Sequence, residues 1–321
     1  MKPWFKFFAM LACCASVAAQ AQYPDKPIRL IVPFSPGGNI DATARIISGG
    51  LAERLGQTVI VENRAGAGGT VGSEFVARSS PDGYTMLLGS TGALAPVRSL
   101  HPKTKLQPTE DFAAAAPLTR APLVLVVSPT LPVKTLAEFI EYAKARPGKL
   151  TFASAGVGTA AHLTGELFQK LSGTEFLHVP YKGSSLAVAD LLGGHVDLTF
   201  DQLASTLSQI QAGKLRALGA TTDKRSSVMP ELPTLAESGL PGFEASTTTG
   251  LLFPAGTSED IIAKVNAAVQ EVLRLPDVQN QFRELGSDVL IGTGADFDKV
   301  LRDETAKWDG VIKEAGIKPM D

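Results

Sequence analysis

The residues best suited to chemistry lie in short glycine-rich loops that follow apolar strands. The first stretch, IRLIVPFSPGGNIDATARII (residues 28–47), predicts a buried strand, a turn at Gly37 and Gly38, and a helix beginning near Asn39 to Asp41. A glycine pair before a helix leaves backbone N–H groups unpaired at the positive end of the helix dipole. The pattern therefore predicts an anion-binding loop. The alternative is an ordinary strand-to-helix turn in which Asn39 or Asp41 caps the helix.

The same arrangement recurs along the chain. Residues 58–61 read as a strand, and glycines 66, 68 and 69 precede the next helix. Residues 84–93 form a strand that ends in small hydroxylic residues, and residues 149–171 and 176–202 repeat the strand, loop and helix pattern. Alternating β and α elements with short loops favour parallel, doubly wound sheets. In such sheets ligands bind at the carboxyl ends of the strands, where these loops lie.

The remaining segments are assigned more coarsely. Residues 94–111 contain three prolines and are interpreted as a loose surface excursion. Residues 122–129 are strongly strand-like and, with residues 250–253, are expected to cross between two domains. Further predictions are a strand over 213–220, a proline-rich connection over 230–243, and helices over 136–145, 261–273 and 297–314.

Length, composition and the N-terminus indicate an exported globular protein. The chain has 321 residues, 44% hydrophobic, with a formal charge of −2, which fits two domains and gives no reason to expect a nucleic-acid partner. Residues 1–21 combine Lys2 and Lys6, an apolar run and an AQA site, which predicts a signal peptide cleaved near Ala21. The two cysteines, Cys13 and Cys14, lie in that segment. A lipoprotein anchor through Cys13 is the minority alternative.

The common nucleotide, metal and hydrolase motifs are missing from the sequence. It has no Walker A pattern, no HExxH and no GxSxG turn before a helix, and its four histidines are scattered. GVGTAA (156–161) nearly matches a dinucleotide fingerprint, but the next strand leads into Pro180-Tyr181-Lys182 without a terminal acid for a ribose. We expect no cofactor, no metal and no catalytic residues. A secreted enzyme acting on a small organic acid is the alternative.

Several segments resemble one family in order and spacing. They include VENRAGAGG from Val61, PDGYTMLLG from Pro81, HVPYKGSS from His178, DLLGGHVDLTFD from Asp190 and LPTLAESGLPGFE from Leu232. With the first stretch, they resemble the Bug/TctC family, the extracytoplasmic solute receptors of tripartite tricarboxylate transporters. The resemblance covers nearly the whole chain after the signal peptide.

This resemblance implies an α/β, type II periplasmic-binding-protein fold. Two doubly wound domains would be joined by two crossing strands, with the ligand cleft between them. Domain 1 would comprise residues 22–122 and 246–321, and domain 2 residues 123–245. The implied protein is a periplasmic, non-enzymatic and monomeric receptor for a small carboxylate, such as a di- or tricarboxylate, an amino acid or an aromatic acid. It would deliver the ligand to membrane subunits of the transporter, or serve sensing without a dedicated transporter.

Matching the family's loops residue by residue gives a set of candidate ligand-binding positions. They are Phe34, Ser35, Gly37, Gly38, Asp41, Ala67, Gly68, Ser90, Thr91, Ser154, Gly156, Thr159, His162, Tyr181, Lys182, Phe200 and Asp201. For Phe34 and His162 the alternative is core packing, and for Asp41 and Asp201 it is helix capping. Lys182 would pair with a distal carboxylate or remain solvated.

Two segments depart from the family pattern. Thr247, Thr248 and Thr249 stand where relatives tend to carry aromatic residues, so a hydroxyl-lined wall is expected if this segment faces the cleft. Residues 94–107 also look shortened relative to the family. Both departures bear on which ligand is bound.

Overall fold

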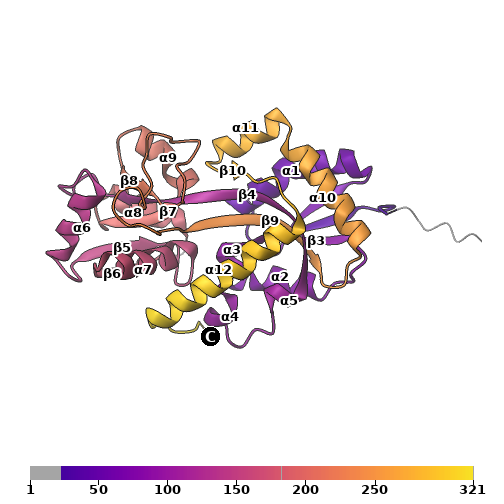
Figure 1. Ribbon diagram of the computed structural model, residues 1–321, viewed down its shortest axis with the longest axis horizontal. Helices are drawn as coiled ribbons and strands as arrows, with labels where there is room; N and C mark the ends of the chain where they lie inside the picture. The colour runs from indigo at the N-terminus through magenta and orange to yellow at the C-terminus, as the bar shows by residue number, and fades with distance from the viewer. Residues whose placement is uncertain (1–22, 182, 321) are drawn as a thin grey trace, which may run out of the picture.

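Two α/β lobes lie end to end and share two long strands, β4 (Phe112–Val127) and β9 (Ser246–Pro254) (Figure 1). The computed structural model describes residues 23–181 and 183–320, so the expected signal peptide and Lys182 lie outside the described residues. β4 pairs with β9 as far as Pro122, opposite Ser246, and from Leu123 onward it pairs with strands of the second lobe. One strand thus belongs to both sheets and connects the lobes.

The first lobe is a mixed sheet covered by helices. Its parallel part is β2-β1-β3, and β9 and β4 extend it in antiparallel fashion. In α1 the apolar residues Ile40, Ala44, Ile47 and Leu51 are buried against this sheet, as their helical spacing requires. The elements of this lobe are β1 (Ile28–Val32), α1 (Asn39–Leu55), β2 (Val59–Asn63), η1 (Ala67–Gly69), α2 (Thr70–Ala77), β3 (Thr85–Ser90), α10 (Glu259–Leu273), α11 (Pro276–Glu284) and β10 (Asp288–Val289).

The second lobe is built in the same way around an aromatic core. Phe152, Phe168 and Phe200 are fully buried, with ring centroids 5.9 Å apart for Phe152–Phe200 and 5.2 Å for Phe168–Phe200. Burying each such ring stabilises the fold by about 2–3 kcal/mol. The elements are α6 (Leu136–Lys144), β5 (Leu150–Ser154), α7 (Ala160–Ser172), β6 (Phe176–Pro180), α8 (Ser184–Leu192), β7 (Leu198–Gln202), α9 (Leu203–Gln211) and β8 (Arg216–Ala220).

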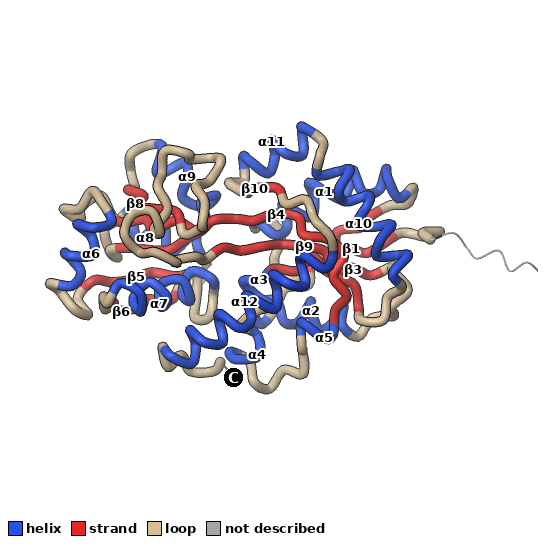
Figure 2. Tube along the Cα trace, viewed as in Figure 1, coloured by secondary structure: helices blue, strands red, loops and turns tan. Residues whose placement is uncertain are grey.

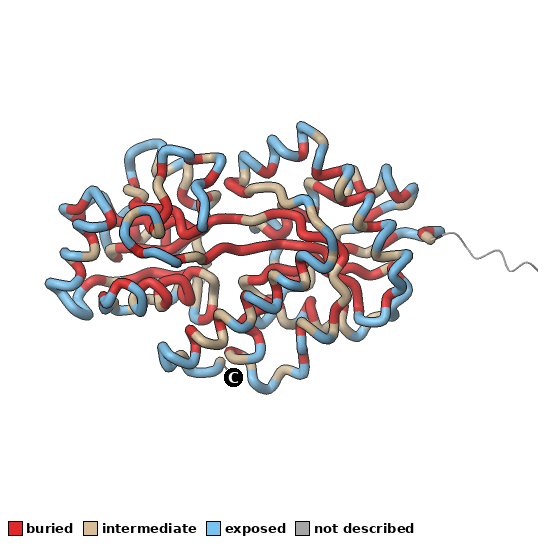
Figure 3. Tube along the Cα trace, viewed as in Figure 1, coloured by how far each residue is buried: buried red, intermediate tan, exposed pale blue. Residues whose placement is uncertain are grey.

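A third group of helices lies where the lobes meet. It consists of α3 (Thr91–Leu94), α4 (Val97–Leu100) and the long α12 (Gly294–Glu314), whereas the short α5 (Pro108–Asp111) precedes β4 in the first lobe. Figure 2 shows α12 running obliquely across both lobes. A capping box of Thr293 and Asp296 starts it, and Glu314 in its last turn pairs with Lys170 of α7. The central strands of both lobes are buried, whereas the outer strands β2 and β6 and the outward helix faces are partly exposed (Figure 3).

The structure corrects several expectations. The sheets are not purely parallel: β4 and β9 carry the chain out of and back into the first lobe, so they pair antiparallel, and β7 and β8 run antiparallel to β4. Residues 94–111 are not a loose excursion, because they form α4 and α5 and bury Leu94, Leu100 and Leu106. Helix α11 was not predicted, and α9 was expected only in the alternative in which Asp201 caps a helix. Within the described residues, no helix has both the length and the apolar composition needed to span a bilayer.

Candidate ligand-binding site

A cavity of about 560 Å³ lies between the two lobes, at the carboxyl ends of β1, β3, β5 and β7. This is the edge at which α/β sheets bind ligands. Its volume is within the usual range for small-molecule sites. The wall comprises Phe34, Gly37, Gly38, Asn39, Ile40, Ala42, Gly68, Thr70, Ser90, Gly92, Ala93, Pro96, Val97, Leu100, His101, Leu123, Ala155, Val157, Gly158, Thr159, Ala160, Ala161, Ser184, Ser185, Asp201, Gln202, Ala204, Ser205, Thr247, Leu285 and Met320.

The first glycine loop brings the start of α1 to this wall. Gly37 has φ +87°, which a residue with a side chain adopts only under strain, and Gly38 is the N-cap with no side-chain cap of its own. The Asp41 carboxylate, one turn into the helix, accepts a hydrogen bond of 2.9 Å from the Gly37 N–H. The first N–H groups of α1 are therefore presented to the cavity at the positive end of the helix dipole.

The second glycine loop does the same for α7 from the other lobe. Gly156 and Gly158 have φ +141° and +76°, and Thr159 is the N-cap, accepting from the His162 N–H. The Gly158 N–H donates to His162 Nδ1 at 3.0 Å, which fixes the loop against its own helix. Since Gly38 and Thr159 both line the cavity, two helix N-termini meet in one space.

The ionisable side chains on the described wall are His101 and Asp201. Asp201 is 6% exposed and accepts hydrogen bonds from the Ser184 hydroxyl and, at 2.7 Å, from the Gln202 N–H. Burial raises the pKa of Asp201, while these two donors oppose the shift. The wall therefore offers an anion backbone N–H groups and helix dipoles rather than a guanidinium or an ammonium group.

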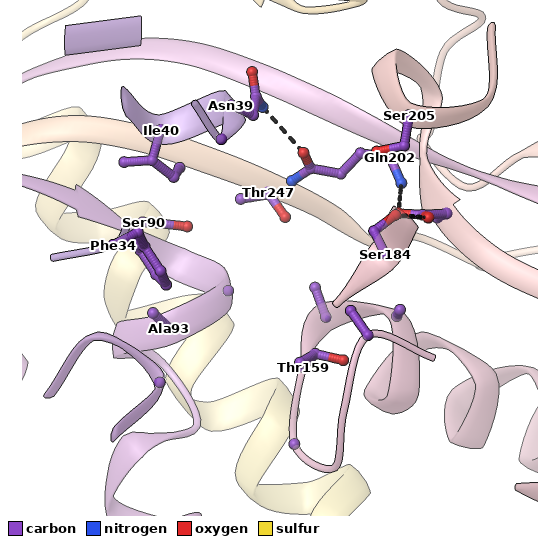
Figure 4. Close-up of a pocket in the computed structure, with 18 of the residues that line it drawn as sticks. Phe34, Asn39, Ile40, Ser90, Ala93, Thr159, Ser184, Gln202, Ser205 and Thr247 are labelled. Atoms are coloured by element: carbon purple, nitrogen blue, oxygen red, sulfur yellow. Dashed lines mark hydrogen bonds between the residues drawn. The ribbon is translucent and has the colours of Figure 1, made fainter. Parts of the chain in front are cut away.

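Polar side chains from both lobes meet beside Asp201. The Asn39 amide nitrogen of α1 donates to the Gln202 amide oxygen at 3.0 Å, across the cavity (Figure 4). Ser184 and Ser205 lie close to Gln202, and Thr247 lies below it in the same view. Asn39 Oδ1 and Thr247 Oγ1 are buried without a hydrogen-bond partner. A buried polar atom without a partner costs free energy, so a hydrogen-bond donor of the ligand at Thr247 Oγ1 would remove this cost, whereas Asn39 Oδ1 points away from the other labelled side chains (Figure 4).

Behind the second glycine loop, two histidines stack on each other. The His162 and His178 ring centroids are 4.0 Å apart with an interplanar angle of 11°. His178 Nε2 lies 2.7 Å from Ser154 Oγ, which in turn donates to the Gly156 carbonyl. Burial, helped by the neighbouring His162, lowers the pKa of His178 to about 4. His178 is thus neutral near pH 7 and supports the loop from behind.

The structure brings seven of the candidate residues into the cavity wall. They come from both lobes and from five separate segments of the chain. They are Phe34, Gly37, Gly38, Gly68, Ser90, Thr159 and Asp201. Ser35 and Ala67 belong to the same loops but are exposed and lie outside the wall.

Four candidates support the loops from behind instead of lining the cavity. Asp41 is buried and binds Arg45 and Asn63, and these hydrogen bonds, chiefly that from Arg45, lower its pKa to about 2. Thr91 Oγ1 accepts from the Thr248 N–H. His162 and Ser154 make the loop contacts described above. These side chains shape the site without facing it.

Three further candidates lie elsewhere. Gly156 forms the loop's turn, where its carbonyl accepts from the Thr159 hydroxyl at 2.8 Å. The Tyr181 hydroxyl donates to Asp190 at 2.6 Å, and burial raises its pKa to about 12. Phe200 is fully buried in the aromatic core of the second lobe, because side chains alternate along β7 and its neighbour Asp201 takes the cavity side. The alternating pattern thus separates these two candidates.

Sequence reasoning missed part of the wall. Asn39 and Gln202 directly neighbour candidate residues, and Ser184 lies two residues after Lys182, so closeness to the loops in the sequence was the available signal. Pro96, Val97 and Leu100 were missed because residues 94–111 were interpreted as an excursion. Of the three threonines, Thr247 lines the cavity, whereas Thr249 bonds Thr119 at 2.7 Å. Among the described residues, no three His, Cys, Asp or Glu side chains gather as metal ligands would.

Two α/β lobes sharing two long strands, with a cavity walled by both, define a solute-binding protein of the periplasmic-binding-protein fold. A family model described as the tripartite tricarboxylate transporter family receptor matches residues 43–317. The chain belongs to this family, which confirms the resemblance seen in the sequence. A family of receptors also agrees with the expectation of a non-enzymatic protein.

Individual relatives align over nearly the full length of the chain. BugT of Bordetella pertussis is 41% identical over 97% of this chain and 96% of its own. The solved structure of R. palustris Rpa4515 with adipate is 36% identical, covers 93% of this chain and 100% of that chain, and has a TM-score of 0.83. MatC of Rhodopseudomonas palustris with bound malate is 34% identical, covers 90% and 100%, and has a TM-score of 0.79.

Proposed function

We propose that this receptor captures a small organic carboxylate between its two lobes. The observation that carries the proposal is that α1 and α7, one from each lobe, begin at the wall of one cavity. A carboxylate bound between residues 38–40 and 160–161 would receive N–H donors from both lobes at once, because the Gly37 and Gly158 N–H groups already donate to Asp41 and His162. Solved relatives carry adipate and malate, which are acids of this class.

The polar cluster around Asp201 would form hydrogen bonds with the end of the ligand that lies away from the bound carboxylate. A carboxylate ligand and an ionised Asp201 repel each other, so the acid group belongs at the helix N-termini and a hydrogen-bond donor belongs near Asp201. Thr247 Oγ1 adds one unpartnered hydroxyl oxygen to the wall. We assign the seven wall candidates to direct ligand contact, and Asp41, Thr91, Ser154 and His162 to support.

Binding would couple to closure of the lobes. The last pair of β4 with β9, Pro122 opposite Ser246, supports our proposal that domain 1 comprises residues 22–122 plus 246–321 and domain 2 residues 123–245. A ligand that contacts both sides favours the closed arrangement by its higher affinity for it. The family description supports delivery to the membrane subunits of a tripartite tricarboxylate transporter. The N-terminal sequence supports export with cleavage near Ala21. We propose that the exported receptor acts in the periplasm, as a monomer.

Thermal melting against a ligand panel tests the proposal. The chain from residue 22 onward is melted alone and with mono-, di- and tricarboxylates, amino acids and aromatic acids. A ligand at ~100 times its Kd that binds only the folded state adds about 2.7 kcal/mol, which raises the melting temperature by a few degrees. A selective rise with one acid, with no product formed, supports the receptor. A flat response, with no small molecule released from the denatured protein, contradicts it.

A further inference from the structure

The segment that follows α12 turns back and reaches the cavity. Gly316, with φ +63°, takes the left-handed conformation that ends helices, and the Ile317 N–H donates to the Ile312 carbonyl at 3.1 Å. This reverses the chain direction, and the Met320 N–H then donates to the Leu100 carbonyl of α4 at 2.6 Å. Met320 therefore lines the cavity although it lies far from every other wall residue in the sequence.

Met320 sits where both lobes meet. A Cβ atom placed on Gly158 would lie 2.5 Å from Leu100 Cδ1 and 2.7 Å from Met320 Cε, so these side chains pack directly on the second glycine loop. The ion pair between Glu314 and Lys170 holds the end of α12 on α7 and so keeps the segment near this loop. The bare backbone of Gly158 is what allows the contact.

The chemistry of this part of the wall differs from that beside Asp201. Pro96, Val97, Leu100 and Met320 present carbon and sulfur atoms, whereas Asn39, Ser184 and Gln202 gather at the junction of β7 and α9. Each ligand methylene buried against an apolar wall raises the affinity about fourfold. A ligand hydroxyl group placed there finds no hydrogen-bond partner, so its burial is unfavourable.

We propose that Met320 and Leu100 form an apolar wall by which the receptor selects carboxylates with a hydrocarbon body over short hydroxylated acids. The inference rests on the proposed function and names the ligand class of the same cavity. The segment after α12 then acts in ligand selection, and Met320 is a specificity-determining residue.

Calorimetric titration with succinate, adipate, suberate and malate tests this selection. In the unmodified protein, affinity increases with hydrocarbon length and adipate is preferred to malate. Met320→Ser weakens adipate binding at least about fivefold and malate binding less than twofold. The ratio of adipate affinity to malate affinity therefore decreases. Met320→Leu restores the preference, and Lys318→Ala, an exposed change in the same segment, leaves it intact.

Two results would overturn the selection model while leaving the receptor function in place. One is an unchanged preference in Met320→Ser. The other is an equal loss for adipate and malate. If the unmodified protein binds none of the four acids and no member of the melting panel, the proposed receptor function is wrong. The proposed selection by Met320 and Leu100 is then wrong as well.

Discussion

Asn39, the first residue of α1, donates a hydrogen bond of 3.0 Å to Gln202, the last residue of β7. The two residues are 163 positions apart and belong to different lobes, so this bond spans the cavity. Both side chains also line the ligand space. The bond between them therefore links closure of the lobes to the shape of the site.

Breaking this bond should weaken ligand binding in a coupled manner. Asn39→Ala and Gln202→Ala are each expected to lower carboxylate affinity by up to about tenfold, mainly through faster dissociation. The double variant should lose less than the sum, with a coupling energy of about 0.5–1.5 kcal/mol, because both changes remove one hydrogen bond. Stopped-flow kinetics and calorimetry on the two single variants and the double variant measure this double-mutant cycle. The exposed Gln211→Ala is the control. Strictly additive losses would show that the bond does not hold the lobes.

The two glycines of the first loop should respond differently to valine. Gly37→Val forces a β-branched residue to φ +87° and should cost about 1–2 kcal/mol of unfolding free energy, although the space around it is open. Gly38 has φ −84° and room for a Cβ, so Gly38→Val should fold normally. Its side chain intrudes at the start of α1 and should reduce carboxylate affinity at least about tenfold. Urea unfolding and calorimetry separate the two effects, and undiminished affinity in Gly38→Val would remove this loop from the site.

Removing the charge of Asp201 should stabilise the ligand-free protein. Because burial raises its pKa, the folded state binds a proton more tightly than the unfolded state. The contribution of the protonated Asp201 to the unfolding free energy is fully present below the unfolded-state pKa of about 3.9. It is lost as the pH rises through the folded-state pKa. The Asp201→Asn variant should therefore have an unfolding free energy on the order of 1 kcal/mol higher than the unmodified protein at pH 7, and an equal one near pH 3. The exposed Glu231→Gln is the control. A loss of stability at pH 7 would mean that the ionised carboxylate is needed by Ser184 and Gln202.

His178 should make the second lobe sensitive to acid. Its pKa of about 4 in the folded state lies below the ordinary value of about 6.5, so the stability it contributes is present above pH 6.5 and lost as pH falls through 4. His178→Gln keeps a hydrogen-bonding partner for Ser154 and should flatten the decline in unfolding free energy between these values. Urea unfolding at several pH values measures it, with the exposed His195→Gln for comparison. Identical pH profiles for His178→Gln and the unmodified protein would contradict the assignment.

The features that could be predicted from the sequence are those that depend on residues close together in the chain. Strand, glycine loop and helix were found at Gly37–Gly38 and again at Gly156–Gly158, because hydrophobic periodicity and glycine spacing are local signals. The second half of the crossing strand β4, from Pro122 onward, was predicted for the same reason, whereas its first half from Phe112 was not. The resemblance of many segments to one family then supplied the fold, which these patterns alone left open.

The contacts between distant segments were not predictable in this way. Asn39 meeting Gln202 and Met320 meeting Leu100 depend on how lobes and helices pack, which no local pattern encodes. Phe200 was expected in the site, whereas alternation along β7 directs it into the core and Asp201 toward the cavity. Residues 94–111 were misjudged because three prolines obscured the helical spacing of Leu94, Val97 and Leu100.

A crystal structure with the acid that raises the melting temperature most tests the central claim most directly. We predict one acid in the cavity, with its carboxylate oxygens within hydrogen-bond distance of N–H groups in residues 38–40 and 160–161. A carboxylate bound outside this cavity, or held within it away from both helix N-termini, would contradict the account.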